Sequence, residues 1–127
     1  MSREEDVALS ELQIAVMREL WSRQEASPAE VAQALAGQRG LAHTTVATLL
    51  SRLEKRGVVA ARRDGRQLVY RALVSEDQVR RSMVAGLLTT VFGGDAPALV
   101  SHLVRESDIG ADDLERIKRL LAKAKAR

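Results

Sequence analysis

Side chains that could bind an extended anion are concentrated between residues 43 and 71. Hydroxyl groups can donate to phosphate oxygens or to base edges, and a guanidinium can bind guanine or phosphate through two parallel hydrogen bonds. The residues that we expect to do this are His43, Thr44, Thr45, Thr48, Ser51, Arg52, Lys55, Arg62, Arg63 and Arg66. These residue types predict binding to double-stranded DNA rather than catalysis.

The distribution of charge supports the same interpretation. In this chain of 127 residues, the first 38 have a formal balance of −4, residues 39–71 one of +6, and residues 72–127 one of +1. Localised positive charge is the electrostatic footprint of a site for a polyanion. An arginine-rich solvated surface is the alternative, and charge alone does not separate the two.

Capping signals and apolar periodicity indicate the helices that come before this stretch. Ser10 and Ser27 are each followed three residues later by a Gln or a Glu, which is the pattern of a capping box at a helix N-terminus. The first helix should end near Arg23, and Gly37 should stop the second.

A third helix is expected from His43 to Arg56, with Gly57 as its C-terminal cap. Its apolar residues recur at helical spacing and leave the hydroxyl and cationic side chains on the other side. These apolar residues are Val46, Leu49, Leu50 and Leu53. The period then changes, and residues 58–63 and 66–71 are typical of two strands joined at Asp64-Gly65, a strong hairpin signal.

The order helix, helix, helix, hairpin predicts a mainly α fold with a small β-hairpin wing, that is, a winged helix-turn-helix followed by a helical region. We expect a winged-helix DNA-binding domain over residues 1–73 and a helical dimerisation domain over residues 74–127. The third helix would read bases in the major groove, and Arg62, Arg63 and Arg66 of the wing would neutralise phosphates. Solvated threonines and edge-strand charges that prevent aggregation are the structural alternatives.

The C-terminal half carries apolar stripes that need a partner. A capping box at Ser75 starts a long helix, which Gly93-Gly94 breaks, and two further helices follow on either side of a second break at residues 107–110. About fifty residues cannot bury all these stripes against a small domain, so we expect a symmetric homodimer and a pseudo-palindromic DNA site. A compact six-helix monomer is the alternative. The expected dimer contacts are Leu87, Leu88, Val91, Leu99, Leu103, Leu114, Ile117, Leu120 and Leu121.

The sequence offers no catalytic constellation, so no enzyme activity, cofactor or metal site is expected. Cysteine is absent, which excludes disulfides, thiolate catalysis and cysteine metal sites. His43 has no Asp or Glu at a helical spacing suited to sharing a metal, and His102 has only Glu106. Without a signal peptide or a run of about 20 apolar residues, we expect a soluble cytoplasmic protein. A helical interaction module whose basic hairpin meets an acidic partner is the alternative function.

The chain resembles the penicillinase repressor (BlaI/MecI) family of bacterial winged-helix regulators, which includes the copper-responsive CopY branch. The resemblance spans nearly the whole chain. It is carried by Leu9–Gln13, Val16-Met17, Leu20-Trp21, Thr44–Val46 with Leu49, Arg52-Leu53, Val69-Tyr70, and Leu99-Val100 after Gly93–Asp95.

The resemblance implies a homodimeric repressor of β-lactam resistance or other stress genes, with intertwined C-terminal helices. In the best-known members, a membrane sensor-protease signal leads to cleavage in this region, and the matching bond here is His102-Leu103, where those members carry Asn-Phe. The copper branch uses a C-terminal cysteine motif, which this chain lacks. Members often place basic residues where Thr44 and Ala47 stand, so a different operator sequence is expected here.

Overall fold

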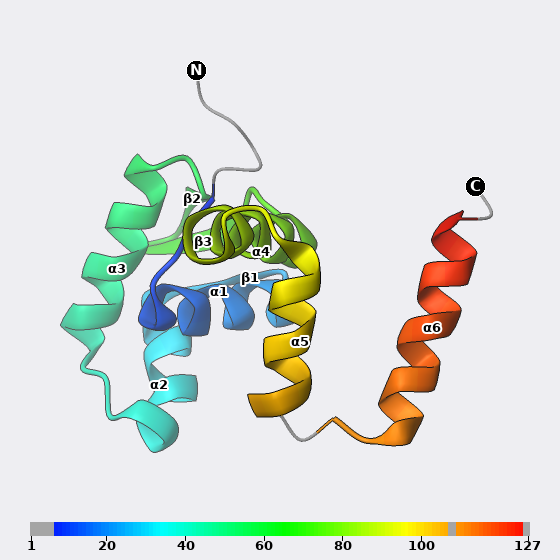
Figure 1. The fold of residues 1–127 in the computed structure, drawn as a ribbon. Helices are drawn as coiled ribbons and strands as arrows, with labels where there is room; N and C mark the ends of the chain where they lie inside the picture. The colour runs from blue at the N-terminus through cyan, green and yellow to red at the C-terminus, as the bar shows by residue number, and fades with distance from the viewer. Residues whose placement is uncertain (1–6, 107–108, 126–127) are drawn as a thin grey trace. The chain divides into compact units, whose positions relative to one another are not determined.

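The computed structural model describes residues 7–106 and 109–125, apart from the side chains of Gln38 and Arg39 (Figure 1). The chain forms two compact units, Met1–Ala85 and Gly86–Arg127. The elements in chain order are α1 (Glu11–Arg23), β1 (Glu25–Ala26), α2 (Pro28–Arg39), α3 (His43–Lys55), β2 (Val59–Asp64), β3 (Gln67–Ala72), α4 (Glu76–Phe92), α5 (Ala96–Glu106) and α6 (Ala111–Lys125).

Three helices begin at the capping boxes that the sequence predicts. In each box the serine hydroxyl accepts from a backbone N–H at 3.0–3.2 Å, and the Gln or Glu side chain accepts from the serine N–H at 2.8–2.9 Å. The pairs are Ser10 with Gln13 (α1), Ser27 with Glu30 (α2) and Ser75 with Gln78 (α4). These reciprocal bonds satisfy backbone donors that the first helical turn leaves without partners.

The end of α2 differs from the prediction, because Gly37 does not stop the helix. The helix continues to Arg39, and Gly40 caps it in the left-handed conformation with φ +61° and an N–H donated to Ala36 O at 3.0 Å. A glycine inside a helix costs only about 1 kcal/mol relative to alanine, so Gly37 can be part of the last turns. The residue that must adopt positive φ determines where the helix ends.

The end of α3 agrees with the prediction and turns the chain directly into the sheet. The N–H of Val58 donates to Leu53 O, and that of Gly57 donates to Glu54 O, both at 3.0 Å. This pair of bonds around Gly57, whose φ is +78°, is a Schellman motif. Val58 and Leu53 are both buried, so an apolar contact at the core accompanies the cap.

The hairpin forms as predicted, but it belongs to a three-stranded antiparallel sheet with the order β1-β3-β2. Its turn lies one residue later than the predicted Asp64-Gly65, because Asp64 pairs with Gln67 as the last residue of β2 and leaves Gly65 and Arg66 to form the turn. Strand β1, whose Glu25 pairs with Arg71 of β3, was not predicted from the sequence. A strand of two residues is too short to show an alternating pattern.

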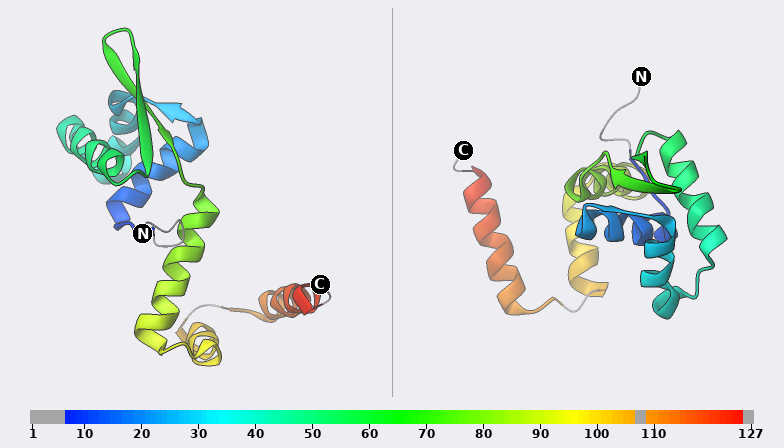
Figure 2. Two further views of the ribbon diagram at one scale, coloured as in Figure 1. Left: turned by 90° about the horizontal axis from the view of Figure 1, so that it is seen from above. Right: turned by 180° about the vertical axis from the view of Figure 1, so that it is seen from behind.

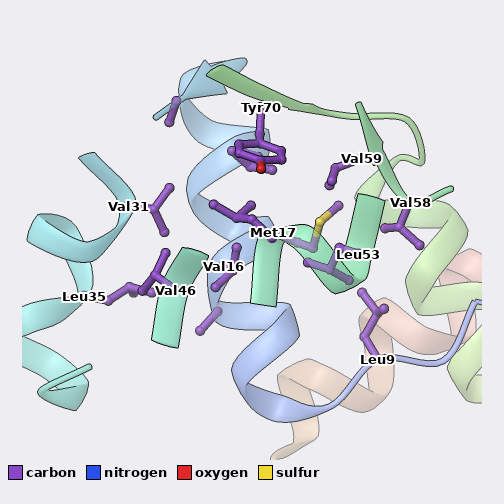
Figure 3. Close-up of a cluster of buried hydrophobic side chains, with 14 of the residues drawn as sticks. Leu9, Val16, Met17, Val31, Leu35, Val46, Leu53, Val58, Val59 and Tyr70 are labelled. Carbon is purple, nitrogen blue, oxygen red and sulfur yellow. The ribbon is translucent and has the colours of Figure 1, made fainter. Parts of the chain in front are cut away.

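The core of the first unit lies between α1, α2 and α3 and one face of the sheet (Figure 3). Val16 and Met17 of α1 are fully buried, as are Val46, Leu50 and Leu53 of α3. From the sheet, Ala26, Val59 and Tyr70 complete this cluster. The hairpin projects past the helices of this unit (Figure 2), so its tip stays in solvent.

The first unit extends into α4, beyond the boundary between residues 73 and 74 that the sequence analysis drew. The Trp21 indole Nε1 donates to Val74 O at 2.9 Å, which ties the start of α4 to α1. Val79 of α4 belongs to the core cluster, and Ser82 is also buried. The compact units divide after Ala85 for this reason, and the division into functional domains stays a prediction.

The second unit contains the end of α4 together with α5 and α6. The break at Gly93-Gly94 is confirmed, since α4 ends at Phe92 and α5 begins at Ala96. Of the second predicted break, residues 107 and 108 lie outside the described part of the chain. In that described part, α5 and α6 have no buried residue. No single helix among the described residues is long and apolar enough to span a membrane, and α4 and α5 reach that length and hydropathy only when they are taken together as a bent pair.

Alanine substitutions of the two glycines near the end of α2 should have opposite effects on the free energy of unfolding. Gly40→Ala places a Cβ at positive φ and should destabilise the protein by about 1–2 kcal/mol. Gly37→Ala meets no atom within 4 Å and should stabilise the helix by up to about 1 kcal/mol. Urea unfolding of both variants measures the two signs, and a destabilising Gly37→Ala would mean that α2 ends at Gly37.

Candidate nucleic-acid interface

Helix α3 presents two contrasting faces because its buried residues recur at helical spacing. Val46, Leu50 and Leu53 are fully buried, and they fix one face of α3 against the core. The seven residues of α3 that the sequence analysis assigned to DNA binding are all exposed. They are His43, Thr44, Thr45, Thr48, Ser51, Arg52 and Lys55. The structure therefore places the predicted reading residues on solvent-facing positions of a single helix.

A shallow hollow on α3 is lined by Thr44, Thr45, Thr48, Leu49 and Arg52. The Thr48 hydroxyl donates to Thr44 O at 2.9 Å, so its proton is used within the helix and its oxygen remains free to accept. Leu49 packs partly against the core and also lines the hollow. Leu49 was predicted only as part of the apolar stripe of α3, and its position at the edge of that stripe is the sequence signal for this second role.

The arginines of the hairpin differ in their surroundings. Arg62, Arg63 and Arg66 are all exposed, but of these three only Arg62 forms an ion pair within the described residues. Its guanidinium donates from Nε to Glu25 Oε2 at 3.1 Å and from Nη2 to Oε1 of the same carboxylate. Arg63 and Arg66 are thus available to an external anion, whereas Arg62 already has a partner.

The bond with Arg62 changes the titration of Glu25. The hydrogen bond from the guanidinium lowers the pKa of the Glu25 carboxyl below its ordinary value, with a smaller contribution from the charge of Arg71. The same contact raises the pKa of Arg62. A lowered carboxyl pKa means that the ion pair is complete above the ordinary pKa of a glutamate and is lost as the pH falls through the folded-state value. The pair is therefore intact at neutral pH.

Sequence reasoning could not find Glu25 as part of this surface. Glu25 and Arg62 are 37 positions apart, and the contact depends on the pairing of β1 with β3. The only sequence signal for an acidic residue near the hairpin was the negative balance of the first 38 residues, which were not assigned to the DNA-binding surface.

The residues assigned to dimerisation lie in the second unit. Leu88 and Leu99 are half-buried, and the others are exposed, with Leu120 at 67% and Val91 at 65%. The candidate cleavage bond between His102 and Leu103 lies inside α5, and the His102 ring lies edge-on to Phe92 with a centroid distance of 6.0 Å. Among the described residues, no three His, Asp or Glu side chains could hold a metal ion.

Comparison with known proteins gives three further findings. The family model described as Penicillinase repressor matches residues 9–123. The transcriptional regulator BlaI of Mycobacterium tuberculosis (strain CDC 1551 / Oshkosh) is 38% identical over 120 residues, which cover 93% of this chain and 86% of that protein. The methicillin resistance regulatory protein MecI of Mammaliicoccus sciuri is 26% identical over 115 residues, with coverage of 91% and 94%.

A solved structure extends the likeness to the fold. The solution structure of the DNA-binding domain of the repressor BlaI matches with a TM-score of 0.52 and 26% identity. It covers 61% of this chain and 93% of that domain. The predicted winged-helix fold is thereby confirmed.

Proposed function

This chain belongs to the penicillinase repressor family of transcriptional regulators, and we propose that it represses transcription as a homodimer that binds pseudo-palindromic DNA operators. One observation carries the proposal: the hydroxyl-rich, cationic face of α3 is exposed in a unit that matches the DNA-binding domain of BlaI. An exposed helix face of this kind fits the DNA major groove.

In this proposal α3 reads bases. Arg52 binds a guanine with two hydrogen bonds, and the hydroxyls of Thr44, Thr45 and Ser51 contact phosphates or base edges. Thr48, whose proton is bound to Thr44 O, accepts a hydrogen bond from a base amino group. Leu49 gives the hollow an apolar floor that suits a thymine methyl group.

The wing supplies affinity without sequence choice. Arg63 and Arg66 are exposed and have no ion-pair partner among the described residues, so each can neutralise a phosphate. Lys55 extends this positive surface to the end of α3, and the imidazole of His43 at the start of the helix can donate a hydrogen bond to a phosphate. Each phosphate contact adds to the dependence of binding on salt.

The unburied apolar residues of the second unit support the homodimer. Exposed apolar residues recur along α5 and α6, and neither helix has a buried residue in its described part. Apolar patches of this extent on a single chain mark interaction surfaces, and a two-fold dimer covers the same patch on both copies. A dimer also presents two α3 helices to successive turns of DNA.

The regulated genes would be β-lactam resistance or other stress-response genes, in keeping with the names of the relatives. An operator on the chromosome implies that the protein acts in the cytoplasm. If a membrane sensor-protease signal ends in cleavage at His102-Leu103, α5 must open first, since the bond lies within the helix and not in an extended segment. Induction through this bond would therefore depend on the stability of α5.

Alanine substitutions of Arg52 and Arg63 should distinguish base recognition by α3 from phosphate binding by the wing. Arg52→Ala should cost about 1–3 kcal/mol on the operator and relax the preference at particular base pairs. Arg63→Ala should weaken binding to all duplexes similarly and reduce the salt slope by about one unit. Fluorescence anisotropy with operator and scrambled duplexes, the operator being found by genomic footprinting, measures both. Equal losses on both duplexes for Arg52→Ala would contradict its reading role.

The dimer should be visible by sedimentation equilibrium at micromolar concentration. We expect the wild type to sediment as a dimer of the 13.9 kDa chain. Leu120→Glu should shift it to the monomer, because this side chain is 67% exposed in the single chain and a buried charge would be costly. Glu115→Gln on the same exposed helix serves as the control and should not change the mass. A wild type that sediments only as a monomer would contradict the proposal.

A further inference from the structure

The outer face of the sheet, opposite the buried core, carries charged side chains from all three strands. Tyr70 of β3 belongs to the core, so its neighbours Val69 and Arg71 point to the opposite face. The strand register places Glu25 beside Arg71 and Arg62 beside Val69. This face therefore holds the Glu25 carboxylate and the guanidinium groups of Arg62 and Arg71, from three different strands, with Asp64 on the same face at the end of β2.

The Arg62 side chain crosses β3 to reach Glu25 on the far strand. Both oxygens of the Glu25 carboxylate accept hydrogen bonds from the Arg62 guanidinium, one from Nε and one from Nη2, so the contact is bidentate. The two side chains are nevertheless exposed, by 51% for Arg62 and 41% for Glu25. An external anion can thus reach a guanidinium that already has a partner.

A DNA phosphate offers the same kind of acceptor as the carboxylate of Glu25. Both present two anionic oxygens that match the guanidinium fork, so they compete for it. The internal pair is weak enough to be exchanged, because exposed ion pairs contribute little to stability. After exchange, Glu25 keeps the charge of Arg71 as its neighbour, which lowers the cost of leaving the carboxylate behind.

We propose that Glu25 is an internal competitor for the wing arginine Arg62, which exchanges this carboxylate for a DNA phosphate when the protein binds. The inference rests on the proposed DNA-binding function and goes beyond it, because it assigns to β1 a residue that lowers general affinity for DNA. While the pair is intact, Arg62 and Glu25 together contribute no net charge. The exchange therefore adds little to the salt dependence of wild-type binding, unlike a phosphate contact made by Arg63.

The test is a double-mutant cycle on the full chain, with Glu25→Gln, Arg62→Gln and the double variant. Binding to a random-sequence DNA duplex is measured by anisotropy between about 50 and 200 mM salt, the range in which counterion release dominates. Glu25→Gln should tighten binding by up to about fivefold per wing and steepen the salt slope by up to about one unit per wing. In the Arg62→Gln background, the same substitution should change neither quantity.

A matched control separates this exchange from the simple loss of a negative charge. Glu54→Gln removes an exposed carboxylate from α3 and leaves the contact between Arg62 and Glu25 in place. Its effect should therefore persist in the Arg62→Gln background. Glu25→Asp keeps the charge but shortens the reach, and it should give an intermediate gain. Thermal unfolding of each variant verifies that the sheet is folded.

The outcomes distinguish this inference from the function on which it rests. If Glu25→Gln leaves binding unchanged or weakens it, or acts equally without Arg62, the competition between Glu25 and phosphate is wrong while DNA binding stands. If the wild type does not bind the duplex at any of these salt concentrations, the proposed function is overturned, and this inference with it.

Discussion

The burial of one face of α3 is the constraint on which the rest of the candidate interface depends. Val46, Leu50 and Leu53 have no solvent exposure, and rotating α3 about its axis would bring them into water. Burying a leucine or valine side chain contributes about 1.5–3 kcal/mol, so these residues together hold α3 in one orientation. The position of the threonines and Arg52 is therefore a consequence of core packing. No contact among the polar residues themselves has to fix it.

The same core also determines the position of the wing. The Schellman motif around Gly57 connects α3 to β2 through residues 56–58 alone. Val59 and Tyr70 anchor the hairpin in the buried cluster to which α3 also contributes. The reading helix and the anchoring hairpin thus share one set of buried side chains. A substitution in this core would disturb both functions together, whereas changes at the exposed residues would separate them.

Local features could be predicted from the sequence, and features that depend on tertiary contacts could not. The capping boxes at Ser10, Ser27 and Ser75 each need only four consecutive residues, and the amphipathic face of α3 needs only its own periodicity. The prediction of where α2 ends was wrong because Gly37 and Gly40 are the same residue type and differ only in backbone conformation. Strand β1 and the pair between Glu25 and Arg62 depend on chain segments far apart in sequence, so no local pattern reports them. Through the contact between Glu25 and Arg62, the acidic first 38 residues contribute a side chain to the basic surface.

The most direct test of the account is a titration of the ¹⁵N-labelled protein with a short DNA duplex, followed by NMR spectra of the backbone amides and arginine side chains. We predict that the largest changes occur at the exposed face of α3, from Thr44 to Lys55, and at the arginines of the hairpin. The buried residues of α3 should change less, since the core holds the helix in place before DNA binds. Changes confined to α5 and α6, with α3 and the hairpin unaffected, would contradict it.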